Sequence, residues 1–84
     1  MEEKLIGKVI HYFDKIQVAI VELKDKIKIG DKIKIKGHNK EFEQEVTSLQ
    51  IEHKDVKEAK KGETVGMKVT EKVKEGDGVY LVSE

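Results

Sequence analysis

The sequence contains no cysteine and no arginine, and only 5% of its 84 residues are aromatic. Without cysteine, disulfides and thiolate metal sites are excluded, and nothing indicates an oxidising compartment. No segment approaches the roughly 18 apolar residues that a membrane span requires. The first residues, Met1-Glu2-Glu3-Lys4, are acidic and carry no apolar run, so we expect no signal peptide. We therefore expect a soluble, cytoplasmic protein that folds as one domain over residues 1–84.

The missing arginine also bears on the choice of partner. All seventeen basic residues are lysines, which act as solvated point charges, whereas arginine is the usual residue for bidentate recognition of phosphates and bases. The seventeen acidic residues bring the net charge to zero, although 40% of the residues are charged. These features disfavour a dedicated nucleic-acid binder. The abundance of lysine and glutamate, with no cysteine, is typical of a thermophile.

The charge is unevenly distributed along the chain. Residues 24–40 carry seven lysines and two aspartates, a net charge of +5, whereas residues 1–23 carry −1 and residues 41–84 carry −4. We name residues 24–40 the basic segment. A basic segment in a neutral chain is a candidate surface for an anionic partner.

The basic segment also has a clear structural pattern. Isoleucines alternate with lysines on both sides of Gly30-Asp31, which is typical of strands with one face buried and one in water. The pattern predicts short strands at residues 26–29 and 32–36, joined by a turn at Gly30-Asp31.

Further strands are predicted where β-branched residues concentrate, at residues 5–11, 16–23, 41–52, 64–69 and 78–82. In 16–23, apolar residues lie on both faces, which indicates a strand that is partly covered on both sides. In 41–52 the apolar phase shifts, so we expect a β-bulge near Thr47-Ser48. Residues 53–61 favour a loop or a single helical turn. Short strands without a long helix predict an all-β fold, and a domain this small is best served by a barrel without open edges.

One local pattern, K-x-G-[DE]-x-[IV], occurs three times, at residues 28–33, 60–65 and 74–79. We interpret it as a tight turn in which glycine takes a positive φ and the acidic side chain caps a turn amide. A branched residue then begins the next strand. Asp31, Glu63 and Asp77 are therefore predicted to be structural rather than catalytic.

The order of these turns and strands resembles domain 2 of translation elongation factors. The resemblance rests on four segments in sequence: I-K-I-G-D-K-I-K-I-K-G (27–37), V-T-S-L-Q-I (46–51), V-K-E-A-K-K-G-E-T-V-G (56–66) and V-K-E-G-D-G-V (73–79). H-Y-F-D-K (11–15), I-K-G-H (35–38) and Q-I-E-H (50–53) resemble small stand-alone elongation-factor-like proteins. The chain also resembles the C-terminal barrel of collagenase-like peptidases, a family that includes RNA-modifying enzymes.

The resemblance implies a closed six-stranded antiparallel Greek-key β-barrel. In elongation factors this domain helps to hold the aminoacyl end of tRNA, and Glu58 matches the position that lines the terminal-adenosine pocket. Lys15-Ile16-Gln17-Val18 replaces the Arg-Gly-Thr signature of the family near the second strand. The chain has no G-x-x-x-x-G-K-[ST] loop, so we expect neither GTPase activity nor a bound nucleotide.

The candidate nucleic-acid-binding residues are six lysines, two aromatics and one acid: Lys26, Lys28, Lys32, Lys34, Lys36, Lys40, Tyr12, Phe13 and Glu58. The lysines would follow a phosphate backbone and the aromatics would stack on bases. The alternative is that the lysines form a solvated face that prevents edge pairing, and that the aromatics close one end of the barrel.

No catalytic or metal site is predicted. His11, His38 and His53 are spaced by 27 and 15 residues, which matches no ligand pattern, and no cysteine supports them. No nucleophile–base pattern is present, so we expect no enzymatic activity, no cofactor and no metal.

The sequence thus favours a non-enzymatic adaptor that contacts RNA (tRNA or the ribosome) or a protein of the translation or RNA-modification machinery, without a membrane role. The alternative is an accessory domain that docks onto a separately encoded collagenase-like peptidase or RNA-modifying enzyme. A third hypothesis is self-association, with the lysines only keeping the chain soluble.

Overall fold

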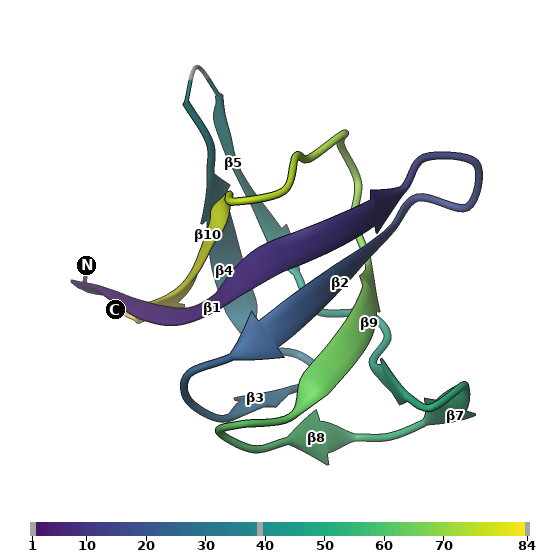
Figure 1. The fold of residues 1–84 in the computed structure, drawn as a ribbon. Helices are drawn as coiled ribbons and strands as arrows, with labels where there is room; N and C mark the ends of the chain where they lie inside the picture. Colours follow the sequence, from purple (N-terminus) through teal and green to yellow (C-terminus); the bar gives the residue numbers. More distant parts are fainter. Residues whose placement is uncertain (1, 39, 84) are drawn as a thin grey trace.

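The computed structural model describes residues 2–38 and 40–83, and all regular structure within them is β (Figure 1). The strands are β1 (Glu2–Phe13), β2 (Val18–Leu23), β3 (Ile27–Lys28), β4 (Lys32–Lys36), β5 (Glu41–Glu45), β6 (Gln50–Ile51), β7 (Lys54–Asp55), β8 (Glu58–Ala59), β9 (Thr64–Lys68) and β10 (Gly78–Ser83). Because these residues form no helix, none of them provides a helix that could cross a bilayer. The all-β prediction is confirmed.

Eight strands form one antiparallel sheet in the order β5-β4-β10-β1-β2-β9-β6-β7, and β3 pairs with β8 alone. Six of the strands, namely β1, β2, β4, β5, β9 and β10, are five residues or longer. These six are also consecutive in the sheet, from β5 to β9. The long strands therefore form the main body of the fold. Of the two-residue strands, β6 and β7 extend the sheet beyond β9, and β3 and β8 form their own pair.

The core consists of alternate side chains from these strands. Ile33 and Ile35 of β4, Val21 of β2 and Val65 of β9 are all at most 1% exposed. The alternation of the basic segment is thus confirmed for β4, with isoleucines inside and lysines outside. Ile29, in contrast, is 39% exposed because it lies in the turn between β3 and β4.

The repeated K-x-G-[DE] pattern forms three similar turns, as predicted. Gly30, Gly62 and Gly76 have φ values of 93°, 89° and 97°. In each turn the acidic residue donates its backbone N–H to the carbonyl of the lysine three residues before it. Its carboxylate accepts the N–H of that lysine, at 3.0, 2.7 and 2.9 Å. Glycine at the third position of such a turn takes the positive φ that side chains disfavour.

The prediction of one long strand at 41–52 is wrong, because the strand ends where a bulge was expected. The chain does leave its phase at the predicted place, but it forms no bulge there. β5 ends at Glu45, residues 46–49 leave the sheet, and β6 resumes at the opposite end of the sheet order. Val46 and Leu49 are both buried, so this connection adds an apolar side chain to the core at each of its ends.

Two other expectations need correction. Residues 53–61, predicted as a loop or a single helical turn, contain the short strands β7 and β8 with irregular residues between them. β1 runs from Glu2 to Phe13, so it extends beyond both ends of the strand predicted at 5–11. The register of β1 shifts near Ile10 and again between Leu5 and Gly7, where the strand passes close to β2. A Cβ on Gly7 would lie 2.7 Å from Val21 Cγ1, so this glycine permits a close approach.

Gln44 joins two strands that have no backbone pairing. It lies on β5 and is 8% exposed. Among the residues that the structure describes, it is the one polar residue that is buried. Its Nε2 donates to the carbonyl of Lys68 at 2.9 Å, and its Oε1 accepts the N–H of Thr70 at 2.9 Å. The side-chain amide thus occupies the place of a peptide group between β5 and the end of β9.

Candidate functional site

The structure distributes the candidate nucleic-acid-binding residues over several regions. Lys32, Lys34 and Lys36 lie on β4, Tyr12 and Phe13 end β1, and the others lie on or near β3, β5 and β8. They do not form one continuous basic surface, because each group of lysines meets acidic residues from other parts of the chain.

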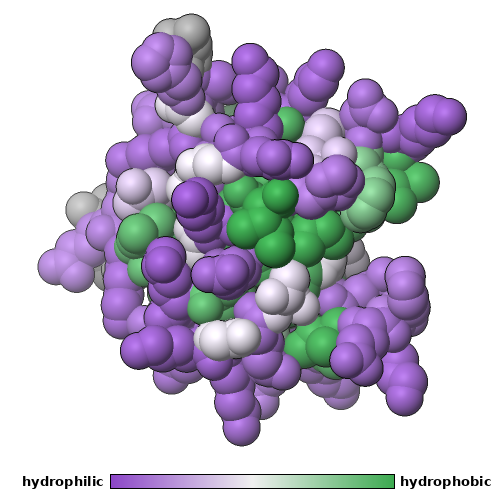
Figure 2. All heavy atoms as spheres, viewed as in Figure 1, coloured by the Kyte–Doolittle hydropathy of each residue, from purple (hydrophilic) through white to green (hydrophobic). Residues whose placement is uncertain are grey.

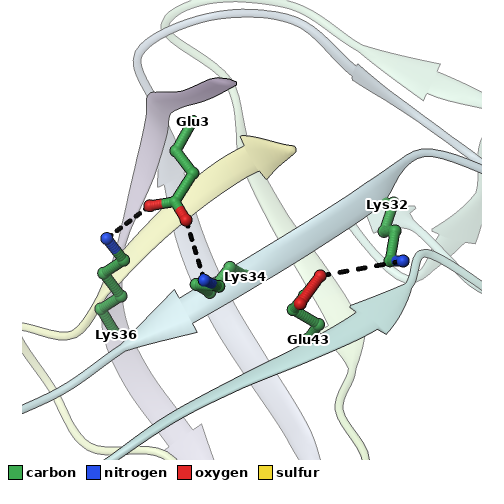
Figure 3. A network of polar contacts seen from close by, with 5 residues as sticks. All are labelled: Glu3, Lys32, Lys34, Lys36 and Glu43. Carbon is green, nitrogen blue, oxygen red and sulfur yellow. Dashed lines mark hydrogen bonds and ion pairs between the residues drawn. The ribbon is translucent and has the colours of Figure 1, made fainter. Parts of the chain in front are cut away.

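The clearest case is the outer face of β4. Lys32, Lys34 and Lys36 stand opposite Glu45, Glu43 and Glu41 of β5 in the register of the sheet. Lys32 Nζ lies 3.8 Å from Glu43 Oε1. From the other side, Glu3 of β1 reaches across β10 and pairs with both Lys34 and Lys36 (Figure 3). We name these seven residues the charged face: Glu3, Lys32, Lys34, Lys36, Glu41, Glu43 and Glu45.

Glu3 is the centre of the charged face. Its Oε2 lies 2.8 Å from Lys34 Nζ, and its Oε1 pairs with Lys36. Hydrogen bonds from Lys34 and then Lys36 lower the pKa of Glu3 from its ordinary 4.5 to about 2. The same bonds raise the pKa of each lysine. Lys36 also lies 4.8 Å from the centre of the Tyr80 ring. These lysines are therefore occupied within the fold.

The other lysines of the set also have acidic neighbours. Lys40 Nζ lies 3.1 Å from Glu71 Oε1. Lys28 stands opposite Glu58 in the β3–β8 pair. Lys26, Lys28 and Glu58 line a shallow cavity of about 320 Å³, so the structure does bring these three predicted residues together. The excess of +5 in the basic segment is a property of the sequence window, and in three dimensions Glu3, Glu43, Glu58 and Glu71 offset most of it.

The two aromatic candidates face different environments. Tyr12 is half-buried and packs against the core. Phe13 is 45% exposed and contacts the His11 ring edge to face, with ring centres 4.5 Å apart. His11 in turn lies 3.3 Å from the carboxylate of Glu75. Tyr12 thus contributes to the edge of the core, and Phe13 belongs to the outer surface.

Phe13 borders a groove that the sequence analysis did not identify. The groove has a volume of about 380 Å³. We name it the apolar groove, and it is lined by Phe13, Ile16, Val18, Ile20, Gln50, Glu52, His53, Thr64, Val65 and Gly66. One wall comes from the β1–β2 hairpin and the other from the β6–β7 hairpin. Figure 2 shows apolar surface over β1 and β2, and a notch between the two hairpins.

The floor of the apolar groove is formed by the outward side of β2 and β9. Val18 and Ile20 are half-buried and alternate along β2 with the fully buried Ala19 and Val21. Gly66 of β9 stands opposite Ile20 and also opposite Gln50 of β6. A Cβ on Gly66 would meet Val18 and Ile20 at 3.4 and 3.6 Å, which are ordinary contact distances. Neither packing nor a positive φ requires this glycine, and its lack of a side chain leaves the floor hollow.

The turns beside the apolar groove have unusual backbone conformations. Within the described part of the chain, three non-glycine residues have positive φ: Gln17 (56°), Glu52 (51°) and His53 (67°). Gln17 is in the β1–β2 turn, whereas Glu52 and His53 form the two-residue β6–β7 turn. Such a turn normally contains Asn-Gly, because side chains disfavour this region. Strain of this kind concentrates at functional sites.

One signal for the apolar groove was present in the sequence. The strand at 16–23 has apolar residues on both faces, which predicted partial cover on its second side. The other wall gave no signal, because Gln50, Glu52 and His53 are ordinary polar residues whose positions depend on the fold. Among residues 2–38 and 40–83, no group of three or more His, Asp or Glu side chains is placed to hold a metal ion.

The chain is similar in sequence to part of a longer archaeal protein. It is 50% identical over 80 residues to an "uncharacterized protease" of Methanocaldococcus jannaschii. The match covers 94% of this chain but only 20% of that relative. The chain therefore spans about a fifth of the length of the curated relative that it matches. No protein-family model matches the chain.

The fold is similar to a solved bacterial domain. The C-terminal domain of a putative U32 peptidase from Geobacillus thermoleovorans superimposes with a TM-score of 0.90 at 18% identity, covering 95% of this chain and 93% of that domain. Its selenomethionine variant gives 0.86 at 19% identity, covering 90% and 96%. These matches support the expected likeness to the C-terminal barrel of collagenase-like peptidases. The likeness to elongation-factor domain 2 and the contact with RNA stay predictions.

Proposed function

We propose that this chain is a non-catalytic accessory β-domain that docks onto a peptidase-like protein. The proposal rests above all on the match to the archaeal relative, which covers nearly all of this chain and a fifth of that protein. Half of the aligned residues are identical, so the archaeal protein contains a segment closely similar to this chain within a much longer sequence. The fold of the bacterial domain, which lies at the C-terminal end of a putative U32 peptidase, supports the same arrangement.

The absence of catalysis is part of the proposal. The carboxylates that recur in the chain, Asp31, Glu63 and Asp77, each cap a turn. Glu3 is held ionised between two lysines, which leaves it unsuited to exchange a proton near neutral pH. A domain with these properties contributes binding or positioning, and chemistry falls to the larger partner.

We also propose that the six long strands act as a closed barrel. Backbone pairing connects them from β5 to β9, and the side chain of Gln44 spans the remaining gap to Lys68 and Thr70. A closed barrel has no free edges and so resists unintended strand pairing. Such a rigid body suits a domain that presents one surface to a partner.

The proposed function is tested by binding in trans. The 84-residue chain is titrated into the archaeal relative from which the matching 80 residues have been removed, and the heat of binding is measured. We expect saturable binding that survives nuclease treatment, because the partner is a protein. A chimera, in which this chain replaces the matching segment of the full-length relative, serves as a second measurement if the shortened relative does not fold.

In the chimera, a docked domain changes the thermal transition of the larger body, whereas a domain on a free tether unfolds independently at the temperature of the isolated chain. Independent unfolding together with no binding in trans would contradict the proposal. Titration with tRNA across a salt series is the parallel test of the RNA prediction, in which affinity for tRNA must exceed that for an acidic polymer.

A further inference from the structure

We infer that the apolar groove is the surface through which this domain docks, and that its occupant is an apolar side chain from the peptidase-like body. The inference rests on the proposed function and adds to it the site of contact and the chemistry of the partner. Three observations on the described residues carry it: the composition of the groove, the hollow at Gly66, and the strained turns in its walls.

The composition matches an interface rather than an ordinary outer face. Outward residues of a sheet that faces water are usually polar, as on the charged face. The groove instead places Phe13, 45% exposed, and Ile16, 59% exposed, beside the half-buried Val18 and Ile20. Gln50, Glu52, His53 and Thr64 surround this apolar centre. An apolar centre with a polar rim is the usual anatomy of a protein–protein contact.

The hollow at Gly66 indicates which kind of side chain the groove accepts. Glycine within a strand weakens it, and here neither φ nor packing demands one. Its lack of a side chain deepens the groove between Val18, Ile20 and Gln50. A concavity with an apolar floor accepts an apolar side chain as an anchor, and such anchors supply most of the energy of an interface.

The wall turns indicate that side chains are needed there. Elsewhere in the fold, positive φ is given to Gly30, Gly62 and Gly76. Beside the groove, the chain puts Glu52 and His53 in this conformation, and both line the groove. A glycine would relieve the backbone strain but would remove the polar rim.

The charged face is the competing surface, and charge complementarity disfavours it. Its lysines already pair with Glu3 and Glu43, so a partner would have to break these contacts. The larger body, which accounts for four-fifths of the archaeal relative, is also the partner available at high effective concentration when joined to this domain.

The test uses the full-length chimera and two single-cysteine variants, since this chain has no cysteine of its own. Thr64→Cys places a thiol on the polar rim of the groove, and Lys32→Cys places one on the charged face as the matched control. Labelling by a thiol reagent is followed at each site by peptide mass spectrometry, in the isolated chain and in the chimera. We expect labelling at position 64 to slow by roughly tenfold or more in the chimera and labelling at position 32 to stay unchanged.

A plugged variant supplies the second readout. Gly66→Val fills the hollow with a residue that favours strands, so the isolated chain should be no less stable. In the Thr64→Cys chimera it should restore labelling to the rate of the isolated chain. Protection at position 32 but not at 64 would overturn the groove as the docking site and leave the proposed function intact. Protection at neither site would contradict docking itself. Protection at 64 in the isolated chain, increasing with its concentration, would show a second copy as the occupant and overturn the inference.

Discussion

The outer surface of the sheet carries two contrasting regions, the charged face on β4 and β5 and the apolar groove between the β1–β2 and β6–β7 hairpins. The charged face is formed by alternating residues whose partners lie directly across the sheet or on β1. The apolar groove exposes Phe13 and Ile16 and has strained walls. One region has its interactions completed within the fold, and the other leaves them open. A cluster of charges that are paired within the fold is therefore a weaker sign of a binding surface than a cluster of exposed apolar side chains.

The largest effect on stability is expected at the seam, by which we mean the gap between β5 and the end of β9 that the side chain of Gln44 spans. Gln44→Leu keeps the volume but leaves the Lys68 carbonyl and the Thr70 N–H without their partner. We expect the free energy of unfolding to fall by about 1–3 kcal/mol, because two part-buried hydrogen bonds are lost and both backbone groups are left without their protein partner. Denaturant titration measures it. The control is Gln50→Leu, which removes an exposed hydrogen bond to Asp55 and should cost less than about 0.5 kcal/mol. Equal losses would show that Gln44 does not hold a seam.

The turns give opposite signs in the two kinds of site. Gly62→Ala, in a structural turn with φ of 89°, should destabilise the chain by about 1–2 kcal/mol, because a side chain disfavours that region. His53→Gly, in the wall of the apolar groove, should stabilise the isolated chain by up to about 1 kcal/mol while weakening docking. Thermal unfolding and the labelling assay measure the two quantities. Destabilisation by His53→Gly would show that this turn is not strained.

The charged face is expected to respond to acid through Glu3. Its folded pKa of about 2 lies below its ordinary 4.5, so the ion pairs add stability that is present above about pH 4.5 and is lost as the pH falls toward 2. Between these values the unfolded chain binds a proton at Glu3 that the folded chain does not. Glu3→Gln should reduce proton uptake on unfolding near pH 3 by up to about one proton. Calorimetry in buffers of different ionisation heat measures this uptake, and an unchanged value would remove Glu3 from the charged face.

The smallest effect on stability is expected from the exposed apolar side chains of the groove. Phe13→Ser together with Ile16→Ser should change the free energy of unfolding by about 1 kcal/mol or less, because Phe13 is 45% and Ile16 59% exposed. Binding of an apolar fluorescent dye should fall, whereas Lys32→Gln should leave it unchanged. A loss of stability comparable to that of a core substitution would place these residues in the core and end the comparison.

Much of the fold follows from local patterns. The isoleucines of β4 alternate over five residues, and each glycine turn is complete within six, so a sequence window contains all the information needed. The corner at residues 46–49 was placed correctly but misread as a bulge, because a change of apolar phase looks the same whether the strand bends or ends. The pairing of Glu3 with Lys34 and Lys36 spans more than thirty residues and depends on strand order, which the pattern does not specify.

The candidate site was harder to predict for the same reason. The positive charges of residues 24–40 are close together along the chain, but the acidic residues that offset them lie on other strands of the sheet. The apolar groove combines residues from the β1–β2 hairpin, β9 and the β6–β7 hairpin, and only the two-sided strand at 16–23 indicated it. A missing side chain at Gly66 has no distinctive sequence signal at all, since its effect depends on what surrounds it.

The pairing of β1 with β10 has a consequence for how the domain is carried. Glu2 stands opposite Ser83, so the two ends of the barrel leave it side by side, whereas the β1–β2 hairpin lies on the opposite side (Figure 1). A unit with adjacent ends can be appended to a host, inserted into one of its loops, or released by gene fission, without any change in its strand order. Joining Glu2 to Ser83 through a short linker and opening the chain elsewhere should yield a circular permutant that folds, and this makes the barrel a transferable part.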